Sequence, residues 1–448
     1  MSVPSPPNSP LSRPARLVED FEPRRDALSF GGTVREVGAG YARVAGIEAN
    51  VGDILFNDSD ARLRAEVVQI DKNEALVAPF GATLLLGARM YRRGPPSIAP
   101  TTNWIGRVIN AFGEPIDDLG HLPSGRKSIA VRGEPPAALA RRLVSSGLST
   151  GVRVIDLFAP LCIGQRLGVF AGPGVGKSTL LSMFAKSDRF DLTVVGLIGE
   201  RGREVREFID QFGAFGRSGL IVVVATGDES ALQRRLAAQT TMAVAEYFRD
   251  LGRSVLVILD SVTRFALACR EVAIAAGEPP VSRGFPPSVF TDLPRLLERA
   301  GPGPERAGDI TAVFSVLVDG DDHNDPIADA VRGILDGHIV LDRAVAMQGR
   351  YPAVNIPASI SRLAHIALPS ERLTLANRFR AMIARYEDSR DLRAMGGYVA
   401  GVDADLDTAV AIVPLLYANL AQSGDDPPSV DAFRDVTEAL KRQTAPSS

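Results

Sequence analysis

A glycine-rich turn between two apolar runs constrains the fold of this chain most. The turn is GPGVGKST, residues 172–179, and it separates the apolar residues 167–171 from the apolar residues 180–184. An apolar strand, a glycine turn and a Lys-Ser pair that opens a helix form the pattern of a phosphate-binding loop. The glycines let backbone N–H groups approach an anion, and the N-terminus of the helix adds positive charge. The pattern therefore predicts a strand–loop–helix unit that holds a phosphate group.

Residue types within the loop predict separate roles. We expect Lys177 to pair with the β and γ phosphates and the Ser178 hydroxyl to hold Mg²⁺. The strict spacing asks for glycine at position 171, where this chain has Ala171. We expect the loop to be intact because that position only has to be small. The predicted nucleotide contacts are Gly172, Gly174, Val175, Gly176, Lys177, Ser178 and Thr179.

The composition indicates a globular protein with several domains. A chain of 448 residues is too long for one core, so we expect two to four domains. Two cysteines do not make a disulfide framework, and the four histidines lack zinc-ligand spacing. The sequence has no run of 18 apolar residues, and no apolar signal region follows its start. The net charge of −3 disfavours a nucleic-acid groove, so we expect no nucleic-acid partner.

Hydrophobic patterning divides the chain into four segments. Residues 1–28 begin with a Pro- and Ser-rich stretch that predicts disorder, and the rest of this segment is either a partner-docking element or a solvated tail. Short β-type runs in residues 29–97 predict a small barrel or sandwich. Long aliphatic runs alternate with helical stretches in residues 98–368, which predicts a parallel sheet of the α/β class. Helical periodicity in residues 369–448 predicts a helical domain.

Two acidic residues follow predicted strands of the central segment. Asp260 ends the run SVLVILD, and an acid at the carboxyl end of a strand beside a phosphate loop can hold Mg²⁺ or its water. Glu200 follows the run LTVVGLIG on the same edge of the sheet. A carboxylate there can orient and polarise the water that attacks the γ phosphate. The residues alone also allow a solvated charged turn at Glu200.

Several separate stretches resemble the catalytic subunits of the rotary ATPase superfamily. They are GRVINAFGEPIDD, TGVRVID, AGPGVGKST, IGERGREV and YPAVNIPASISR, within a match from about residue 31 to residue 420. The resemblance implies an α/β fold with an N-terminal small β-barrel, a central P-loop, RecA-like ATPase domain with a parallel sheet, and a C-terminal helical domain. It also implies ATP and Mg²⁺ as ligands.

The same resemblance implies roles for individual residues. Glu200 matches the catalytic acid, where non-catalytic subunits carry Gln, and Arg201 matches its neighbour at the site. Tyr351 matches an aromatic residue that stacks on adenine. Arg362 matches an arginine finger that is lent to a neighbouring subunit. One polypeptide would then carry both the acid and the finger, which implies a homo-oligomer, most simply a closed ring of six.

Two longer stretches resemble the export ATPases of type III secretion. Residues 284–301 and 310–343 are similar to the flagellar export ATPases, also called flagellum-specific ATP synthases, and the ATPases of virulence injectisomes are the alternative. The resemblance implies an ATP-hydrolysing export motor in the cytoplasm or peripherally at the inner membrane. Less close alternatives are a non-catalytic rotary ATPase subunit and an RNA translocase similar to the terminator Rho.

Partners follow from this family resemblance. They are further copies of the chain, an export regulator, a stalk protein, an export gate and chaperone–substrate complexes. The acidic loop at residues 319–326 is either a contact with the stalk protein or a solvated loop.

Overall fold

The computed structural model of this chain describes residues 31–38, 40–57, 59–60, 62–213, 219–318 and 325–444. The chain divides between Pro95 and Pro96 into two compact units. The predicted N-terminal segment 1–28 and residues 319–324 of the acidic loop lie outside the described residues. The domain boundaries expected after residues 28, 97 and 368 stay predictions.

A closed β-barrel forms the described part of the first unit. Its order is β1-β2-β5-β4-β3-β6, and all neighbouring pairs are antiparallel. Alternate side chains such as Val34, Val44 and Val77 fill its interior. The barrel prediction is therefore confirmed, and the sandwich alternative is wrong. The strands are β1 (Gly32–Gly38), β2 (Tyr41–Ala45), β3 (Ile54–Phe56), β4 (Arg64–Asp71), β5 (Glu74–Pro79) and β6 (Arg89–Gly94).

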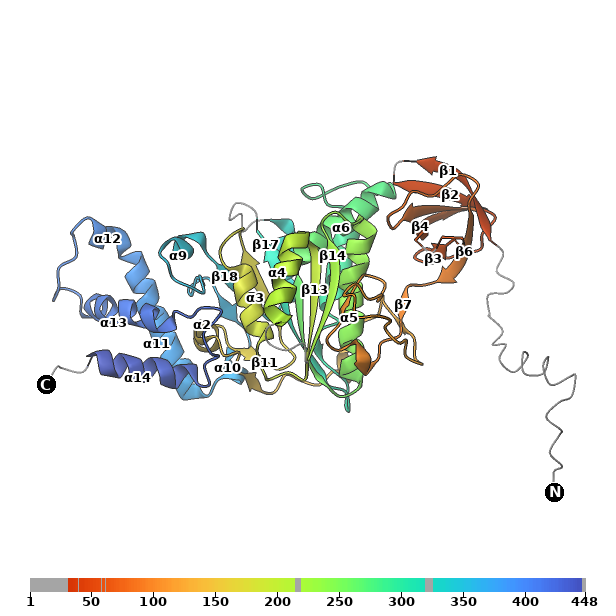
Figure 1. The fold of residues 1–448 in the computed structure, drawn as a ribbon. Coiled ribbons are helices and arrows are strands. Elements are labelled where there is room, and N and C mark those ends of the chain that lie inside the picture. Colours follow the sequence, from red (N-terminus) through yellow and green to blue (C-terminus); the bar gives the residue numbers. More distant parts are fainter. Residues whose placement is uncertain are drawn as a thin grey trace, which may run out of the picture. The chain divides into compact units, whose positions relative to one another are not determined.

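A largely parallel sheet lies at the centre of the second unit (Figure 1). Its order is β19-β18-β12-β17-β15-β13-β14-β8, and β16 pairs with β17. The pairs of β16 and β19 are antiparallel, and the others are parallel. The strands are β8 (Val108–Ile109), β12 (Arg166–Ala171), β13 (Leu192–Glu200), β14 (Leu220–Thr226), β15 (Ser254–Asp260), β16 (Gly301–Pro302), β17 (Asp309–Leu317), β18 (Gly337–Leu341) and β19 (Ile360–Ser361).

Helices cover both faces of this sheet. On one face, α5 (Ala231–Asp250) packs against β13 so closely that a Cβ on Gly196 would lie 2.5 Å from the Thr241 hydroxyl. The adjacent residues of β13 point the other way and share a core with α3 (Lys177–Ala185) and α4 (Gly202–Gly213). Because strands are covered on both faces, they read as continuous aliphatic runs in the sequence.

The C-terminal helices share a core with the sheet. Phe379, Val413 and Val436 are buried in the same hydrophobic cluster as Ile155 and Val169 of β12. The helices concerned are α2 (Arg153–Phe158), α11 (Ser370–Asp388), α13 (Ala404–Leu420) and α14 (Ala432–Thr444). This shared core explains why the predicted helical domain belongs to the second compact unit.

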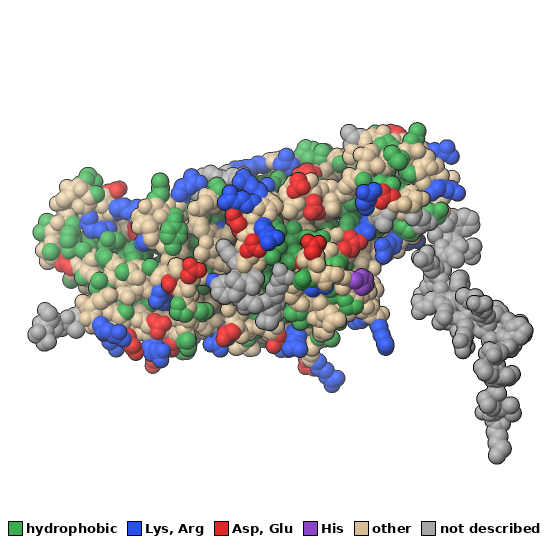
Figure 2. Space-filling model, viewed as in Figure 1, with side chains coloured by type: hydrophobic (Ala, Val, Ile, Leu, Met, Phe, Trp, Pro, Cys, Tyr) green, Lys and Arg blue, Asp and Glu red, His purple; other side chains and the backbone are tan. Residues whose placement is uncertain are grey.

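The second unit also contains elements outside the central sheet. None of the helices in the described ranges is both long and apolar enough to cross a bilayer. On the face shown in Figure 2, basic and acidic side chains are interspersed. The remaining α-helices and strands are α6 (Val262–Ala275), α7 (Pro287–Leu297), α8 (Pro326–Ile334), α9 (Arg343–Met347), α10 (Ala364–Ala367), α12 (Arg390–Ala394), β7 (Ser97–Ile98), β9 (Ile129–Ala130), β10 (Gly147–Leu148) and β11 (Leu161–Cys162).

Candidate nucleotide site

The glycine-rich turn joins β12 to α3 in a conformation that needs glycine. Gly174 and Gly176 have φ angles of 75° and 90°, in the left-handed region that disfavours other residues. Lys177 is the first residue of α3, so the unpaired N–H groups of the first helical turn lie at the loop. A strand, a turn and a helix N-terminus therefore meet where the sequence predicts a phosphate site.

The loop presents some residues to solvent and buries others. Gly172 and Val175 are buried, and Val175 belongs to the hydrophobic core below the loop. Gly174, Ser178 and Thr179 are exposed. The Ser178 hydroxyl is therefore accessible to an ion, while the Val175 side chain anchors the loop.

Three predicted site residues come together at the carboxyl edge of the sheet. Asp260 ends β15 and Glu200 ends β13, and both strands run parallel to β12, the strand that leads to the phosphate loop. The Lys177 ammonium forms an ion pair with Asp260, and its Nζ lies 3.7 Å from Glu200 Oε1. Each of these side chains is at most 13% exposed. Two carboxylates therefore share one buried lysine.

The Glu200 carboxyl is difficult to ionise in this environment. Burial raises its pKa to about 7, and the negative charge of Asp260 acts in the same direction, against the effect of Lys177. Glu200 Oε1 is buried and has no hydrogen-bond partner among the described residues. A carboxyl group that titrates near neutral pH and has an unused acceptor is suited to accept a proton from water.

Arg264 is a further residue at this edge, which the sequence analysis missed. The start of its side chain packs on Gly199, where a Cβ would lie 3.1 Å from Arg264 Cβ. Its Nε is buried and lacks a hydrogen-bond partner among the described residues. Arg264 lies in the first turn of α6, four residues after Asp260, and the packing of α6 against β13 brings it to Gly199.

Arg201 and Tyr351 lie at the margin of this cluster. The Arg201 guanidinium is 87% exposed and lies 4.0 Å from the Glu204 carboxylate. The Tyr351 ring is 45% exposed, and it lies 3.5 Å from the position of a Cβ on Gly176. The Tyr351 side chain is therefore beside the phosphate loop, whereas Arg201 extends into solvent.

The segment between α13 and α14 contacts α3, the helix that follows the phosphate loop. A Cβ on Gly424 would lie 3.0 Å from Thr179 Cγ2, and Lys186 Nζ donates a hydrogen bond of 2.6 Å to the Gly424 carbonyl oxygen. Gln422 N donates to the Tyr351 carbonyl oxygen at 2.9 Å. The C-terminal part of the chain is thus connected to both α3 and Tyr351, which no local sequence pattern indicates.

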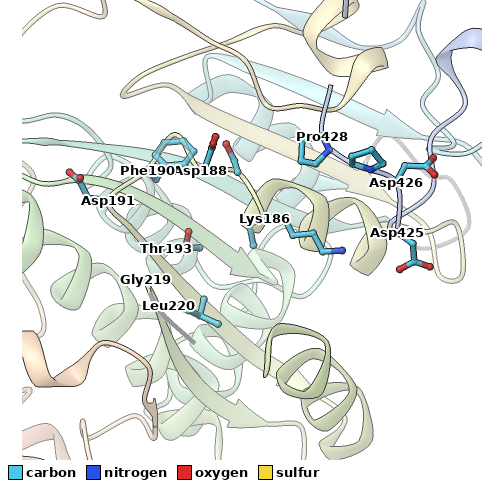
Figure 3. Close-up of a pocket in the computed structure, with 13 residues that line it drawn as sticks. Lys186, Asp188, Phe190, Asp191, Thr193, Gly219, Leu220, Asp425, Asp426 and Pro428 are labelled. Carbon is cyan, nitrogen blue, oxygen red and sulfur yellow. The ribbon is translucent and has the colours of Figure 1, made fainter. Parts of the chain in front are cut away.

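A pocket of about 650 Å³ lies at the end of α3 that is remote from Lys177 (Figure 3). Lys186 and Phe190 line one side, and Asp425, Asp426 and Pro428 line the other. The pocket is therefore separate from the phosphate loop. Its walls belong to the end of α3 and the loop after it, to the starts of β13 and β14, and to the C-terminal segment.

Arg362 lies away from the phosphate loop of its own chain. Ser361 pairs with Gly337 at the start of β18, and β18 runs parallel to β12 with His338 opposite Gly168. Arg362 is therefore near the amino end of β12, about five residues or ~17 Å from the loop at 3.3 Å per residue. Its guanidinium donates a hydrogen bond of 3.3 Å to the Arg332 carbonyl oxygen. The structure does not join Arg362 to the Lys177 cluster.

Known proteins resemble this chain over nearly its whole length. Residues 151–361 match the ATP synthase alpha/beta family, nucleotide-binding domain, and residues 368–439 match the T3SS EscN ATPase C-terminal domain. The flagellum-specific ATP synthase of Rhizobium meliloti is 51% identical over 96% of this chain and 93% of its own length. The corresponding protein of Bacillus subtilis is 45% identical, over 92% of this chain and 95% of its own. The type 3 secretion system ATPase of Xanthomonas euvesicatoria is 43% identical, over 92% and 94%.

Solved structures agree with these matches. The assembled ATPase EscN from the type III secretion system of enteropathogenic E. coli has a TM-score of 0.86 and 39% identity, over 92% of this chain and 100% of that one. The same ATPase in complex with its central stalk EscO has a TM-score of 0.84 with the same identity and coverage. The chain therefore belongs to the ATP synthase alpha/beta family, in the branch of the flagellum-specific ATP synthases and type 3 secretion ATPases.

Proposed function

We propose that this chain is the ATP-hydrolysing motor of a flagellar type III protein export apparatus. The observation that carries the proposal is the cluster of Lys177, Asp260 and Glu200 at the phosphate loop, in a chain up to 51% identical to flagellum-specific ATP synthases. The virulence secretion ATPase is the second candidate, and its support is the 43% identity to the Xanthomonas protein and the likeness to EscN.

The phosphate loop would bind the triphosphate of ATP. Loop N–H groups and the start of α3 point positive charge at the β and γ phosphates, and Lys177 adds a mobile ammonium group. Oxygen donors are what Mg²⁺ prefers, and the exposed Ser178 hydroxyl and the Asp260 carboxylate fit this ion. When bound, Mg²⁺ would neutralise charge on the phosphates. Lys177 can then release Asp260 and pair with the phosphates of the nucleotide instead.

Glu200 would act on the attacking water. Its Oε1, which has no hydrogen-bond partner among the described residues, can accept a hydrogen bond from a water molecule in line with the γ phosphate, and a pKa near 7 suits proton transfer at neutral pH. Arg264 packs on Gly199, the residue before Glu200, and Arg201 extends from the same strand end. These arginines would stabilise charge that develops on the γ phosphate.

Arg362 would complete the site of a neighbouring subunit. Its place at the far end of β12 supports action in trans, because an arginine side chain spans less than half of the ~17 Å to its own loop. We infer a homohexameric ring with Arg362 at each interface. The relative EscN is described in an assembled form and with a central stalk, which supports a ring and a stalk partner for this chain as well.

Nucleotide exchange would be transmitted to the C-terminal helices. Lys186 and Thr179 of α3 contact Gly424, and Gln422 holds the Tyr351 backbone. A shift of α3 or of Tyr351 on ATP binding would therefore move the segment before α14. The remaining proposed partners are an export regulator, an export gate and chaperone–substrate complexes, with a location in the cytoplasm or peripherally at the inner membrane.

Steady-state ATPase assays over a range of protein concentrations test this function. The proteins are the wild type, Glu200→Gln, Arg362→Ala and an equal mixture of these two variants. We expect specific activity to rise with concentration, both variants to be inactive, and the mixture to regain part of the rate. Concentration-independent activity together with a nearly normal Arg362→Ala would overturn the shared site. Export of flagellar subunits in cells whose own export ATPase is replaced by this chain tests the assignment to flagellar export.

A further inference from the structure

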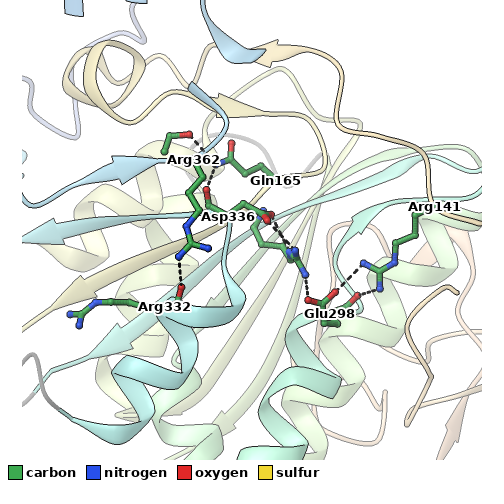
Figure 4. Close-up of polar contacts among 8 residues, drawn as sticks. Arg141, Gln165, Glu298, Arg332, Asp336 and Arg362 are labelled. Atoms are coloured by element: carbon green, nitrogen blue, oxygen red, sulfur yellow. Dashed lines mark hydrogen bonds and ion pairs between the residues drawn. The ribbon is translucent and has the colours of Figure 1, made fainter. Parts of the chain in front are cut away.

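A buried glutamine holds the backbone that carries Arg362. Gln165 is fully buried, and its Oε1 accepts a hydrogen bond of 2.8 Å from Cys162 N. Its Nε2 donates to Ser361 Oγ at 3.1 Å and to the Asp336 carbonyl oxygen at 3.4 Å. Figure 4 shows Gln165 and Asp336 next to Arg362. One amide therefore links the start of β12 to the residue that precedes Arg362.

Asp336 holds Arg362 from the other side. The Arg362 N–H donates to the Asp336 carbonyl oxygen at 2.9 Å. The Asp336 carboxylate accepts two hydrogen bonds of 3.0 Å from the Arg166 guanidinium and one from the Arg166 N–H. Arg166 also pairs with Glu298, which pairs with Arg141 (Figure 4). The backbone of Arg362 is thus bonded to a residue whose carboxylate is itself held by a chain of ion pairs from Arg166 to Arg141.

The local packing leaves little room for this segment to move. A Cβ on Gly337 would lie 2.7 Å from the Ile360 carbonyl oxygen and 3.4 Å from Gln165 Nε2. β19 consists of only Ile360 and Ser361 and pairs with β18 alone. A two-residue edge strand has few backbone hydrogen bonds of its own, so side-chain contacts decide where the following residue points.

We propose that Gln165 is a positioning residue for Arg362, and that its amide sets the reach of this arginine into the neighbouring subunit's site. The inference rests on the proposed function of Arg362 as a lent arginine. A misplacement of about 1 Å at a reacting group can cost on the order of 100-fold in rate. Loss of the Gln165 amide then misplaces Arg362 and lowers kcat, while the phosphate loop of the altered subunit still binds ATP.

Loss of the Gln165 amide can act through β12 or through Arg362, and the test must distinguish these two effects. The residue directly precedes β12, and β12 leads to the phosphate loop at its other end. An effect through β12 would damage the nucleotide site of the same subunit. An effect through Arg362 would damage the site of the next subunit. Mixed rings distinguish these two cases because each subunit contributes one loop and one arginine.

The variant for this test is Gln165→Met, which keeps the length of the side chain and removes its hydrogen bonds. We expect kcat to fall about 10- to 100-fold, with KM for ATP within about twofold of wild type. Ser361→Ala removes one of the same hydrogen bonds with a smaller change, and it serves if Gln165→Met does not fold. Thr240→Val is the matched control, since it loses one buried hydrogen bond, to the Ala111 carbonyl oxygen, on α5. We expect that control to keep kcat.

Mixing then assigns the defect to one side of the interface. Gln165→Met mixed with Glu200→Gln should regain activity, up to about a quarter of wild type if subunits mix at random. Gln165→Met mixed with Arg362→Ala should regain none, because neither subunit supplies a working arginine. Recovery in this second mixture, or an unchanged kcat of Gln165→Met, would overturn the proposal.

The mixture of Glu200→Gln with Arg362→Ala separates this proposal from the proposed function. If that mixture regains activity and the Gln165→Met results differ from those above, only the positioning role fails. If that mixture regains none, the lent arginine itself fails, and the role of Gln165 fails with it.

Discussion

Lys177 Nζ lies 3.7 Å from Glu200 Oε1, although the two residues belong to different strand–helix units of the sheet. The lysine opens α3 after β12, and the glutamate ends β13. The same ammonium group contacts Asp260 at the end of β15. Asp260 and Lys177 therefore act in opposite directions on the basicity of Glu200.

Glu200→Gln should abolish hydrolysis and preserve ATP binding. The amide has the size of the carboxyl group but cannot accept a proton from water, so we expect kcat to fall by about 10²–10⁴. ATPase assays and equilibrium binding of a fluorescent ATP analogue measure the two properties. Glu207→Gln is the control, because Glu207 is exposed and pairs with Arg203 on the surface of α4. Substantial turnover in Glu200→Gln would exclude Glu200 as the base.

The activity of the free enzyme should rise with pH through about 7. Burial and Asp260 raise the pKa of Glu200 to about 7, and only the ionised carboxylate can act as a base. We therefore expect kcat/KM to increase between pH 6 and 8, as read from pH–rate profiles with the protein concentration held constant. A flat profile through this range would show that Glu200 ionises at lower pH.

Stability should move in the opposite direction with pH. The pKa of Glu200 is raised from 4.5 to about 7 in the folded state, so ionisation favours the unfolded chain. As pH rises from 5 to 8, the wild type should lose on the order of 1–3 kcal/mol of unfolding free energy relative to Glu200→Gln. Denaturant titrations of both proteins without nucleotide measure this difference. Parallel pH dependences of the two proteins would contradict the raised pKa.

Lys177→Ala should lose both nucleotide binding and stability. Removal of the ammonium group leaves the Asp260 and Glu200 carboxylates buried together, which costs about 3 kcal/mol or more. The double variant Lys177→Ala/Asp260→Asn should recover part of the stability and none of the ATP binding. Thermal unfolding and ATP titrations check the two effects, and a double variant no more stable than Lys177→Ala would refute the shared-lysine interpretation.

Gly176→Ala should weaken ATP binding beyond its effect on folding. Gly176 has a φ of 90°, where alanine costs about 1–2 kcal/mol, and its Cβ would also contact the Tyr351 ring. Gly277→Ala is matched to it, because Gly277 has a φ of 88° with nothing within 4 Å of its Cβ. We expect similar losses of stability in both variants and an increased KM for ATP in Gly176→Ala alone. Equal KM values would mean that the loop tolerates the added methyl group.

Local sequence patterns missed the strand that closes the barrel. Five β-type runs indicated the strands of the first unit, but the barrel closes through β6, which pairs with β1 and β3. The sequence of β6 is RMYRRG, and only Met90 of this strand is buried. A polar strand gives no hydrophobic alternation, so its existence depends on hydrogen bonds to partners distant in the chain.

Local patterns were enough to predict the phosphate loop and the acids at the edge of the sheet. Glycine spacing, aliphatic runs and strand-terminal residues are local, and parallel strands bring their carboxyl ends to one edge whatever the details of packing. Lys177, Asp260 and Glu200 could therefore be predicted to meet, as they do.

The remote residues that surround this cluster are selected by the three-dimensional packing of the chain. Arg264 packs on Gly199 through the packing of α6 on β13, Gly424 contacts α3 through the shared C-terminal core, and Gln165 holds Ser361 across β18. Each of these contacts joins segments far apart in the chain, and their partners are selected by side-chain shape and buried hydrogen bonds. Periodicity and spacing carry no information about such pairings, because those patterns report only the local path of the backbone.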